Sequence, residues 1–81
     1  MAKSVHTRNY RSFLELLIKV RKDAGVTQQQ LAKRLNRPQS FVSKCENGER
    51  RLAVIELLQF LQSIGVEPIG FISKIVKSTR T

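Results

Sequence analysis

The fold is decided by residues 28–47, which read QQQLAKRLNRPQSFVSKCEN. Apolar residues recur three and four positions apart on both sides of a short interruption, and this spacing predicts two amphipathic helices. Asn36 tolerates a left-handed backbone and Pro38 is accepted only in the first turn of a helix, so the interruption predicts a tight turn. Ala32 is small enough to stand where two helices cross, and Val42 can anchor the second helix.

Helical spacing continues on both sides of this unit. Thr27 and Gln30 have the spacing of a capping box, which predicts a helix start at Thr27. The further helices that we expect cover residues 10–24, 38–46 and 53–63. Residues 69–77 favour a short helix, but Ile and Val dominate there, so a β-strand stays open as an alternative. The predicted fold class is all-α, a compact bundle of about five helices.

The charge balance is the strongest signal in the composition. The 81 residues suffice for one domain, and they carry 15 Lys and Arg against 6 Asp and Glu, a net charge of +9. Such an excess indicates a polyanionic partner, nucleic acid before an anionic membrane. A basic domain without a specific partner fits the charge equally well.

Several classes of protein are disfavoured by what the sequence lacks. Cys45 has no second cysteine to pair with, and with His6 as the single histidine we expect no metal and no cofactor. No glycine-rich phosphate loop, carboxylate pair with a base or Ser-His-Asp set is present, so an enzyme is not expected. No apolar run is long enough to span a bilayer, and residues 1–8 lack the apolar stretch of a secretory signal. We therefore expect a cytoplasmic protein, associated with the nucleoid through DNA.

Two stretches carry a resemblance to a known family. Residues 24–32, AGVTQQQLA, and residues 40–50, SFVSKCENGER, resemble the phage-repressor and Cro-type helix-turn-helix regulators of the xenobiotic response element family. The resemblance covers residues 10–65 and implies a lambda-repressor-like DNA-binding domain. Its third helix would be the recognition helix, lying in the major groove of double-stranded DNA. Asn36 stands where the family usually has Gly, and Ala53 where many relatives have Asp.

The resemblance also assigns roles to particular residues. Gln28 would lie against a phosphate and close to Gln39. Lys33, Arg34 and Arg37 are weaker candidates for phosphate contacts, because the direction of their side chains relative to the groove is open. The alternative is that these side chains are simply solvated. The expected base contacts are Pro38, Gln39, Ser40, Ser43 and Lys44, and the expected phosphate contacts are Gln28, Asn47, Arg51 and Arg37.

Two further roles concern the frame of the domain. The family positions of Arg21 and Glu46 form a salt bridge, and we expect the same pair here in a structural role; an exposed pair would contribute almost nothing. Residues 1–9 are expected to form a flexible basic arm. Its basic residues, taken with the neighbouring Arg11, are Lys3, His6 and Arg8, and they would track phosphate or enter the minor groove. A disordered basic tail is the alternative.

Residues 66–81 form a C-terminal apolar segment that we expect to join two subunits. The segment has more apolar surface than the core of an 81-residue protein can bury, and apolar surface that stays exposed marks interfaces. The alternative is that the segment closes the core of the monomer. The residues expected at the interface, with part of the fourth helix, are Ile69, Phe71, Ile72, Ile75 and Val76.

The leading function is a sequence-specific transcriptional regulator, a repressor that binds a pseudo-palindromic operator as a homodimer. One alternative is an antitoxin that binds a toxin protein and represses its own operon. Another is the controller protein of a restriction-modification system. A helical protein-interaction module that has lost DNA binding is the alternative from a different class.

Overall fold

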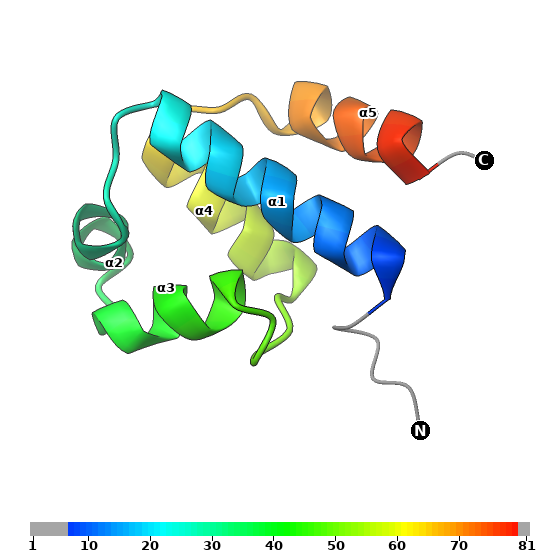
Figure 1. Cartoon of the computed structure of the whole chain (residues 1–81). Helices are drawn as coiled ribbons and strands as arrows, with labels where there is room; N and C mark the ends of the chain where they lie inside the picture. The colour runs from blue at the N-terminus through cyan, green and yellow to red at the C-terminus, as the bar shows by residue number, and fades with distance from the viewer. Residues whose placement is uncertain (1–6, 80–81) are drawn as a thin grey trace.

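The computed structural model describes residues 7–79, and every regular element in that range is a helix. The predicted all-α class is confirmed, and residues 69–77 are helical rather than extended. Lys3 and His6 of the expected basic arm lie outside the described residues. The helices labelled in Figure 1 are α1 (Arg8–Asp23), α2 (Gln28–Leu35), α3 (Gln39–Glu46), α4 (Val54–Ile64) and α5 (Pro68–Thr79).

Side-chain caps determine where the first two helices begin. The hydroxyl of Thr27 accepts a hydrogen bond from the backbone N–H of Gln30 at 3.0 Å, and the Gln30 amide oxygen accepts from the Thr27 N–H at 2.9 Å. This is the predicted capping box, which satisfies N–H groups that a helix start leaves free. α1 begins two residues before the predicted Tyr10, because the Thr7 hydroxyl accepts from the Tyr10 N–H at 3.1 Å.

The turn between α2 and α3 depends on the left-handed backbone of Asn36. This residue has φ 57° and ψ 44°, and it is the one non-glycine residue with positive φ in the described chain. The N–H of Arg37 then donates to the carbonyl of Ala32 at 2.9 Å and closes the end of α2. After α3 the left-handed residue is Gly48, whereas Asn47 keeps a right-handed conformation.

All five helices contribute to one apolar core. Figure 1 shows α1 crossing in front of α4, with α5 beside α1 and with α2 and α3 at the end of the molecule away from α5. Burying this apolar surface is the main favourable term in folding. The largest fully buried side chains are Leu17 of α1, Leu31 of α2, Val42 and Cys45 of α3, Phe60 and Leu61 of α4, and Phe71 of α5.

Phe71 belongs to the core of the protomer, which corrects its assignment to a subunit interface. Its side chain is 2% exposed, and its ring meets that of Phe13 edge-on with the centroids 6.2 Å apart. Ile75 is half-buried and packs against the same core. Because α5 contacts both α1 and α4, the C-terminal segment closes the monomer's core, and only part of its apolar surface remains free.

Within residues 7–79 no single helix is long and apolar enough to cross a membrane, although α4 and α5 together pass that test as a pair bent by 118°. The same residues contain no group of three or more His, Cys, Asp or Glu side chains that could hold a metal ion. Cys45 is fully buried, and burial raises the pKa of its thiol.

Candidate nucleic-acid interface

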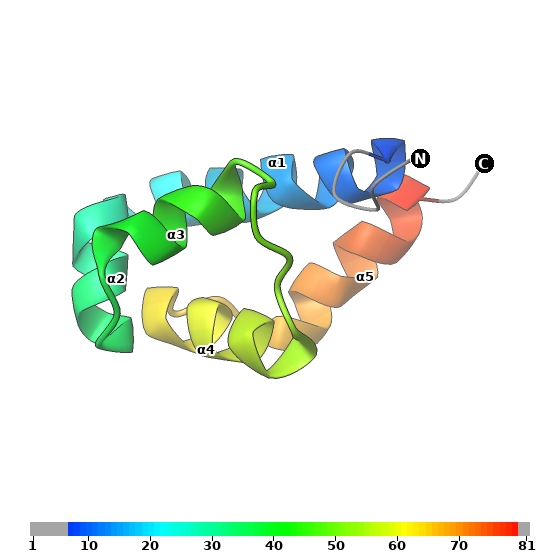
Figure 2. The same ribbon diagram turned by 90° about the horizontal axis from the view of Figure 1, so that it is seen from below.

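The crossing of α2 and α3 leaves one face of α3 open to solvent. Ala32 and Val42 are buried at the crossing, as the sequence predicted. α3 buries four side chains on one side, from Phe41 to Glu46, and its opposite side faces away from the core. Figures 1 and 2 show α2 and α3 at the end of the molecule away from α5.

The open face of α3 carries the residues predicted to contact bases. Gln39, Ser40 and Lys44 are exposed, and Ser43 is half-buried. Their spacing along the helix places Ser40, Ser43 and Lys44 on one side. None of these four side chains makes a hydrogen bond or an ion pair within the described part of the chain. The face therefore presents free donors and acceptors to a ligand.

A buried ion pair holds α3 against α1. Arg21 Nε lies 2.6 Å from Glu46 Oε2 and Arg21 Nη2 lies 2.9 Å from Glu46 Oε1, so the pair is bidentate. The remaining Arg21 terminal nitrogen donates to the carbonyl of Val26 at 2.8 Å. The structural salt bridge expected from the family resemblance is thus present, and it is buried rather than exposed.

Gln28 completes this network, a contact that the sequence did not predict. Its amide nitrogen donates to Glu46 Oε1 at 2.9 Å, and its side chain is half-buried. Gln28 also lines a hollow formed by the end of α1, the loop that follows it and the starts of α2 and α3, together with Gln29 and Gln39. Gln28 and Gln39 thus line the same hollow, and the Gln28 amide nitrogen is used in a hydrogen bond within the protein.

The predicted phosphate-contacting residues flank α3 at both ends. Arg37 lies in the turn before α3, and its guanidinium carbon is 3.7 Å from the centroid of the Phe41 ring. Asn47 and Arg51 follow α3, and both are exposed. The Asn47 amide nitrogen is 3.5 Å from a carboxylate oxygen of Glu49, a long contact that leaves the amide accessible.

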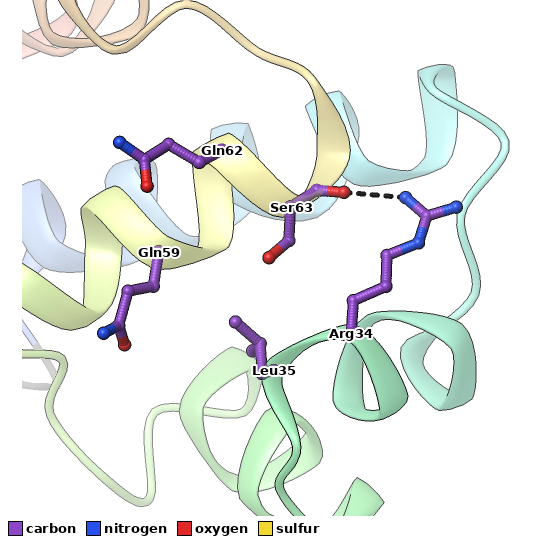
Figure 3. Close-up of a pocket in the computed structure, with 5 residues that line it drawn as sticks. All are labelled: Arg34, Leu35, Gln59, Gln62 and Ser63. Carbon is purple, nitrogen blue, oxygen red and sulfur yellow. Dashed lines mark hydrogen bonds between the residues drawn. The ribbon is translucent and has the colours of Figure 1, made fainter.

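Arg34 points away from this face and stabilises the frame instead. Its guanidinium donates to the backbone carbonyl of Ser63 at 2.7 Å, as Figure 3 shows. That carbonyl belongs to the last turn of α4, where a cation offsets the negative end of the helix dipole. Leu35, Gln59 and Gln62 line the same pocket. Arg34 is therefore no longer a candidate for the groove, whereas Lys33 remains exposed.

The loop between α3 and α4 is fixed by residues that sequence reasoning missed. Arg50 forms a bidentate pair with Glu56, at 2.8 and 2.9 Å, and Glu56 also accepts from the Ala53 N–H at 2.9 Å. The hydrogen bonds from the Arg50 guanidinium lower the pKa of the Glu56 carboxyl, and the hydrogen bond from the Ala53 N–H lowers it further. The hydrogen bonds to Glu56 in turn raise the pKa of Arg50. A glutamate three residues after a helix N-cap is a recognisable capping signal, and it could have identified Glu56.

Tyr10 of α1 also holds the loop between α3 and α4 in place. Its hydroxyl accepts a hydrogen bond from the Leu52 N–H at 3.1 Å, across 42 positions of sequence. No local pattern in the sequence predicts a contact between residues so far apart. The loop that carries Asn47 and Arg51 is thus tied both to α1 and to α4.

A second exposed surface is apolar. Three members of the predicted interface set are exposed: the exposed fractions of Ile69, Ile72 and Val76 are 75%, 44% and 51%. Val54 and Ile55, at the start of α4, are 71% and 64% exposed. Large apolar side chains at this level of exposure are candidates for a protein interface.

Comparison with known proteins agrees with this arrangement. A family model described as a helix-turn-helix domain matches residues 13–68. An XRE-family like protein from Pseudomonas syringae pv. tomato has a solved structure that is 49% identical, covers 95% of this chain and 94% of its own, and superposes with a TM-score of 0.87. The restriction-modification controller protein C.Esp1396I is 22% identical over 89% of this chain and 95% of its own, with a TM-score of 0.79, which shows a shared fold. A search of curated proteins gives no match.

A five-helix bundle with a tight α2–α3 turn and an open polar face on α3 defines the class of helix-turn-helix DNA-binding domains. The chain belongs to the XRE or Cro-type family of these domains, and it is a DNA-binding transcriptional regulator.

Proposed function

We propose that this protein is a repressor that binds a pseudo-palindromic operator as a homodimer and reads its sequence with α3. The observation that carries the proposal is the open face of α3, where Gln39, Ser40 and Lys44 are exposed and unpaired. A glutamine amide pairs in bidentate fashion with adenine N6 and N7, and a lysine reaches guanine O6 and N7. Pro38 and Ser43 complete the base-contacting set.

Phosphate contacts from both ends of α3 position the helix in the groove. Gln28 and Arg37 serve this role before α3, and Asn47 and Arg51 serve it after α3. The net charge of +9 supports this proposal, because neutralising phosphates releases counterions and supplies most of the sequence-independent affinity. Arg8 and Arg11, exposed in the first turns of α1, add to the positive field.

A homodimer supplies the specificity that one short helix lacks. A single recognition helix reads a few base pairs, and two copies related by a two-fold axis read an inverted repeat. We assign the exposed apolar side chains of α5, together with Val54 and Ile55, to the subunit contact. Such a dimer, seated on promoter DNA, excludes other proteins from it, and this is why we favour repression.

The experiment that tests the proposal is selection of bound duplexes from a random pool. The expected result is an inverted repeat whose half-sites lie about one helical turn, or a whole number of turns, apart. Placing the selected site within a promoter should then reduce transcription in vitro. Recovery of no shared sequence would remove the proposed readout, and increased transcription would remove repression.

A controller protein of a restriction-modification system is the second candidate, and the shared fold with C.Esp1396I favours it. Its DNA contacts would be the same. The two candidates differ in the genes beside this one, because a controller stands next to a methylase and a nuclease.

A further inference from the structure

The ring of Phe41 lies between the core and two arginines. The guanidinium carbon of Arg37 is 3.7 Å from the ring centroid, and that of Arg50 is 4.8 Å from it. The ring also packs edge-on against Phe60 of α4, with centroids 5.9 Å apart and an interplanar angle of 65°. Phe41 and Phe60 are both buried, so the ring is held in one place by the core.

The two arginines on this ring are in different situations. Arg50 donates two hydrogen bonds to Glu56 and one to the carbonyl of Arg51, so its charge and most of its donors are used inside the protein. Arg37 is exposed, and its guanidinium makes no hydrogen bond or ion pair with the residues that the structure describes. A guanidinium stacked on an aromatic ring keeps the donors along its edge free.

The backbone of Arg37 is also held in place, next to the start of α3. Its backbone N–H is bonded to the carbonyl of Ala32, and the residue stands two positions before Gln39, the first residue of α3. Phe41 is buried and precedes the exposed Lys44 by three positions, about one helical turn. The stacked guanidinium is therefore held at the edge of the surface that faces DNA in the proposed complex.

We propose that Phe41 is a positioning residue for DNA binding: its ring holds the Arg37 guanidinium ready to bind a backbone phosphate. The planar guanidinium offers paired N–H groups that match two phosphate oxygens. A side chain that is already ordered loses less freedom on binding, so the stack increases affinity without making a contact to DNA itself. This inference rests on the proposed function, and it adds a role for a residue that does not touch the ligand.

The test uses the full chain and a mixed-sequence duplex of about 20 base pairs, because a phosphate contact is independent of sequence. Affinity is measured between about 0.05 and 0.3 M monovalent salt. Arg37→Ala should reduce the slope of log K against log salt by about 0.9 per protomer, and weaken binding by roughly fivefold at 0.15 M salt. The matched control is Lys77→Ala, which removes one exposed charge from α5, far from α3. Equal effects of the two substitutions would overturn the inference.

The role of the ring itself is tested by a double-mutant cycle. In a Phe41→Leu background, Arg37→Ala should cost clearly less affinity than in the wild type, because the arginine is no longer held. Lys44→Ala should cost the same in both backgrounds, which shows that α3 has not moved. An unchanged cost of Arg37→Ala, or an equal change for Lys44→Ala, would refute positioning by Phe41.

Arg37→Lys gives the answer if Phe41→Leu does not fold. Lysine keeps the charge and loses the planar stack, so the salt slope should stay and the affinity should fall. Affinity equal to the wild type would show that the stack has no role in binding. Failure of the wild-type protein to bind the duplex at all would instead contradict the proposed function, so the two failures are distinct.

Discussion

Arg21 of α1 and Glu46 of α3 form a bidentate ion pair in which the two side chains are only 7% and 2% exposed. The pair is enclosed by two further bonds, from Arg21 to the Val26 carbonyl and from Gln28 to Glu46. No buried side-chain nitrogen or oxygen in residues 7–79 lacks a partner. The charges are therefore fully satisfied, and α1, α2 and α3 meet at one carboxylate.

Glu46→Ala should lower the free energy of unfolding by about 3–5 kcal/mol, because it leaves the Arg21 charge buried without a partner. Urea unfolding followed by circular dichroism measures this loss. Asp23→Ala is the matched control, because it breaks an ion pair with Lys19 in which the Lys19 and Asp23 side chains are 68% and 64% exposed. It should lower the free energy of unfolding by about 0.5 kcal/mol or less. Similar losses for the two variants would show that the buried pair has no special structural role.

Gln39→Ala should cost about 1–3 kcal/mol of binding free energy at the selected operator and relax the base preference at one position in each half-site. The physical reason is the loss of a bidentate amide contact to a base edge. Binding to a set of duplexes with single base changes measures both effects. If affinity and preference both stay at the wild-type level, Gln39 does not read a base.

Arg51→Ala provides the contrast to Gln39→Ala. It should weaken binding to all of these duplexes alike and reduce the salt slope by about 0.9 per protomer, since a phosphate contact carries no sequence information. A change in base preference for Arg51→Ala would place its side chain in the groove instead.

The double variant Ile69→Asp with Ile72→Asp should be monomeric at tens of micromolar, whereas the wild type should be dimeric. Both side chains are exposed in the protomer, so charges there oppose association without disturbing the core. Sedimentation equilibrium measures the mass, and circular dichroism checks the fold.

Ser73→Asp is the matched control, because it adds a charge at an exposed polar position of α5. Phe71→Asp is expected to unfold the protomer, since Phe71 is buried in it. A wild-type monomer at this concentration would exclude the proposed dimer.

The stability of the protein should depend on the protonation of Glu56. The neighbouring Arg50 guanidinium holds the pKa of this carboxyl below its ordinary value of 4.5 in the folded state. A lowered folded-state pKa means that the stabilisation is complete above pH 4.5 and is lost as the pH falls through the lower value. Glu56→Gln should therefore be less stable than the wild type at about pH 7, and its stability should fall less between about pH 5 and pH 2.

The measurement is urea unfolding at a series of pH values. Glu15→Gln serves as the control, because Glu15 is exposed on α1 and makes no ion pair with other described residues. It should follow the wild-type curve closely. If Glu56→Gln also follows that curve, the Arg50–Glu56 pair does not contribute to stability in solution.

The elements that the sequence predicted well are those whose determinants are local. The apolar spacing gave the number of helices, the Thr27–Gln30 box gave the start of α2, and Asn36 gave the turn, because caps and turns involve residues a few positions apart. The Arg21–Glu46 pair was predicted only through the family resemblance, since nothing in a single sequence links positions 25 residues apart. The family resemblance did not point to the contact between Tyr10 and Leu52, and this contact was not predicted.

The sequence by itself determined an all-helical bundle with a basic character and a candidate reading face on α3, because periodicity, capping and charge are properties of the chain. Only the tertiary structure decided which apolar residues of α5 are free. Phe71 turns into the core while Ile69 and Ile72 do not, and this depends on how α5 packs on α1 and α4. The same holds for the arginines: Arg34 caps α4, Arg50 pairs with Glu56 and Arg37 stacks on Phe41. Their charges are identical in the sequence, and only the neighbours that folding brings to each of them distinguish their roles.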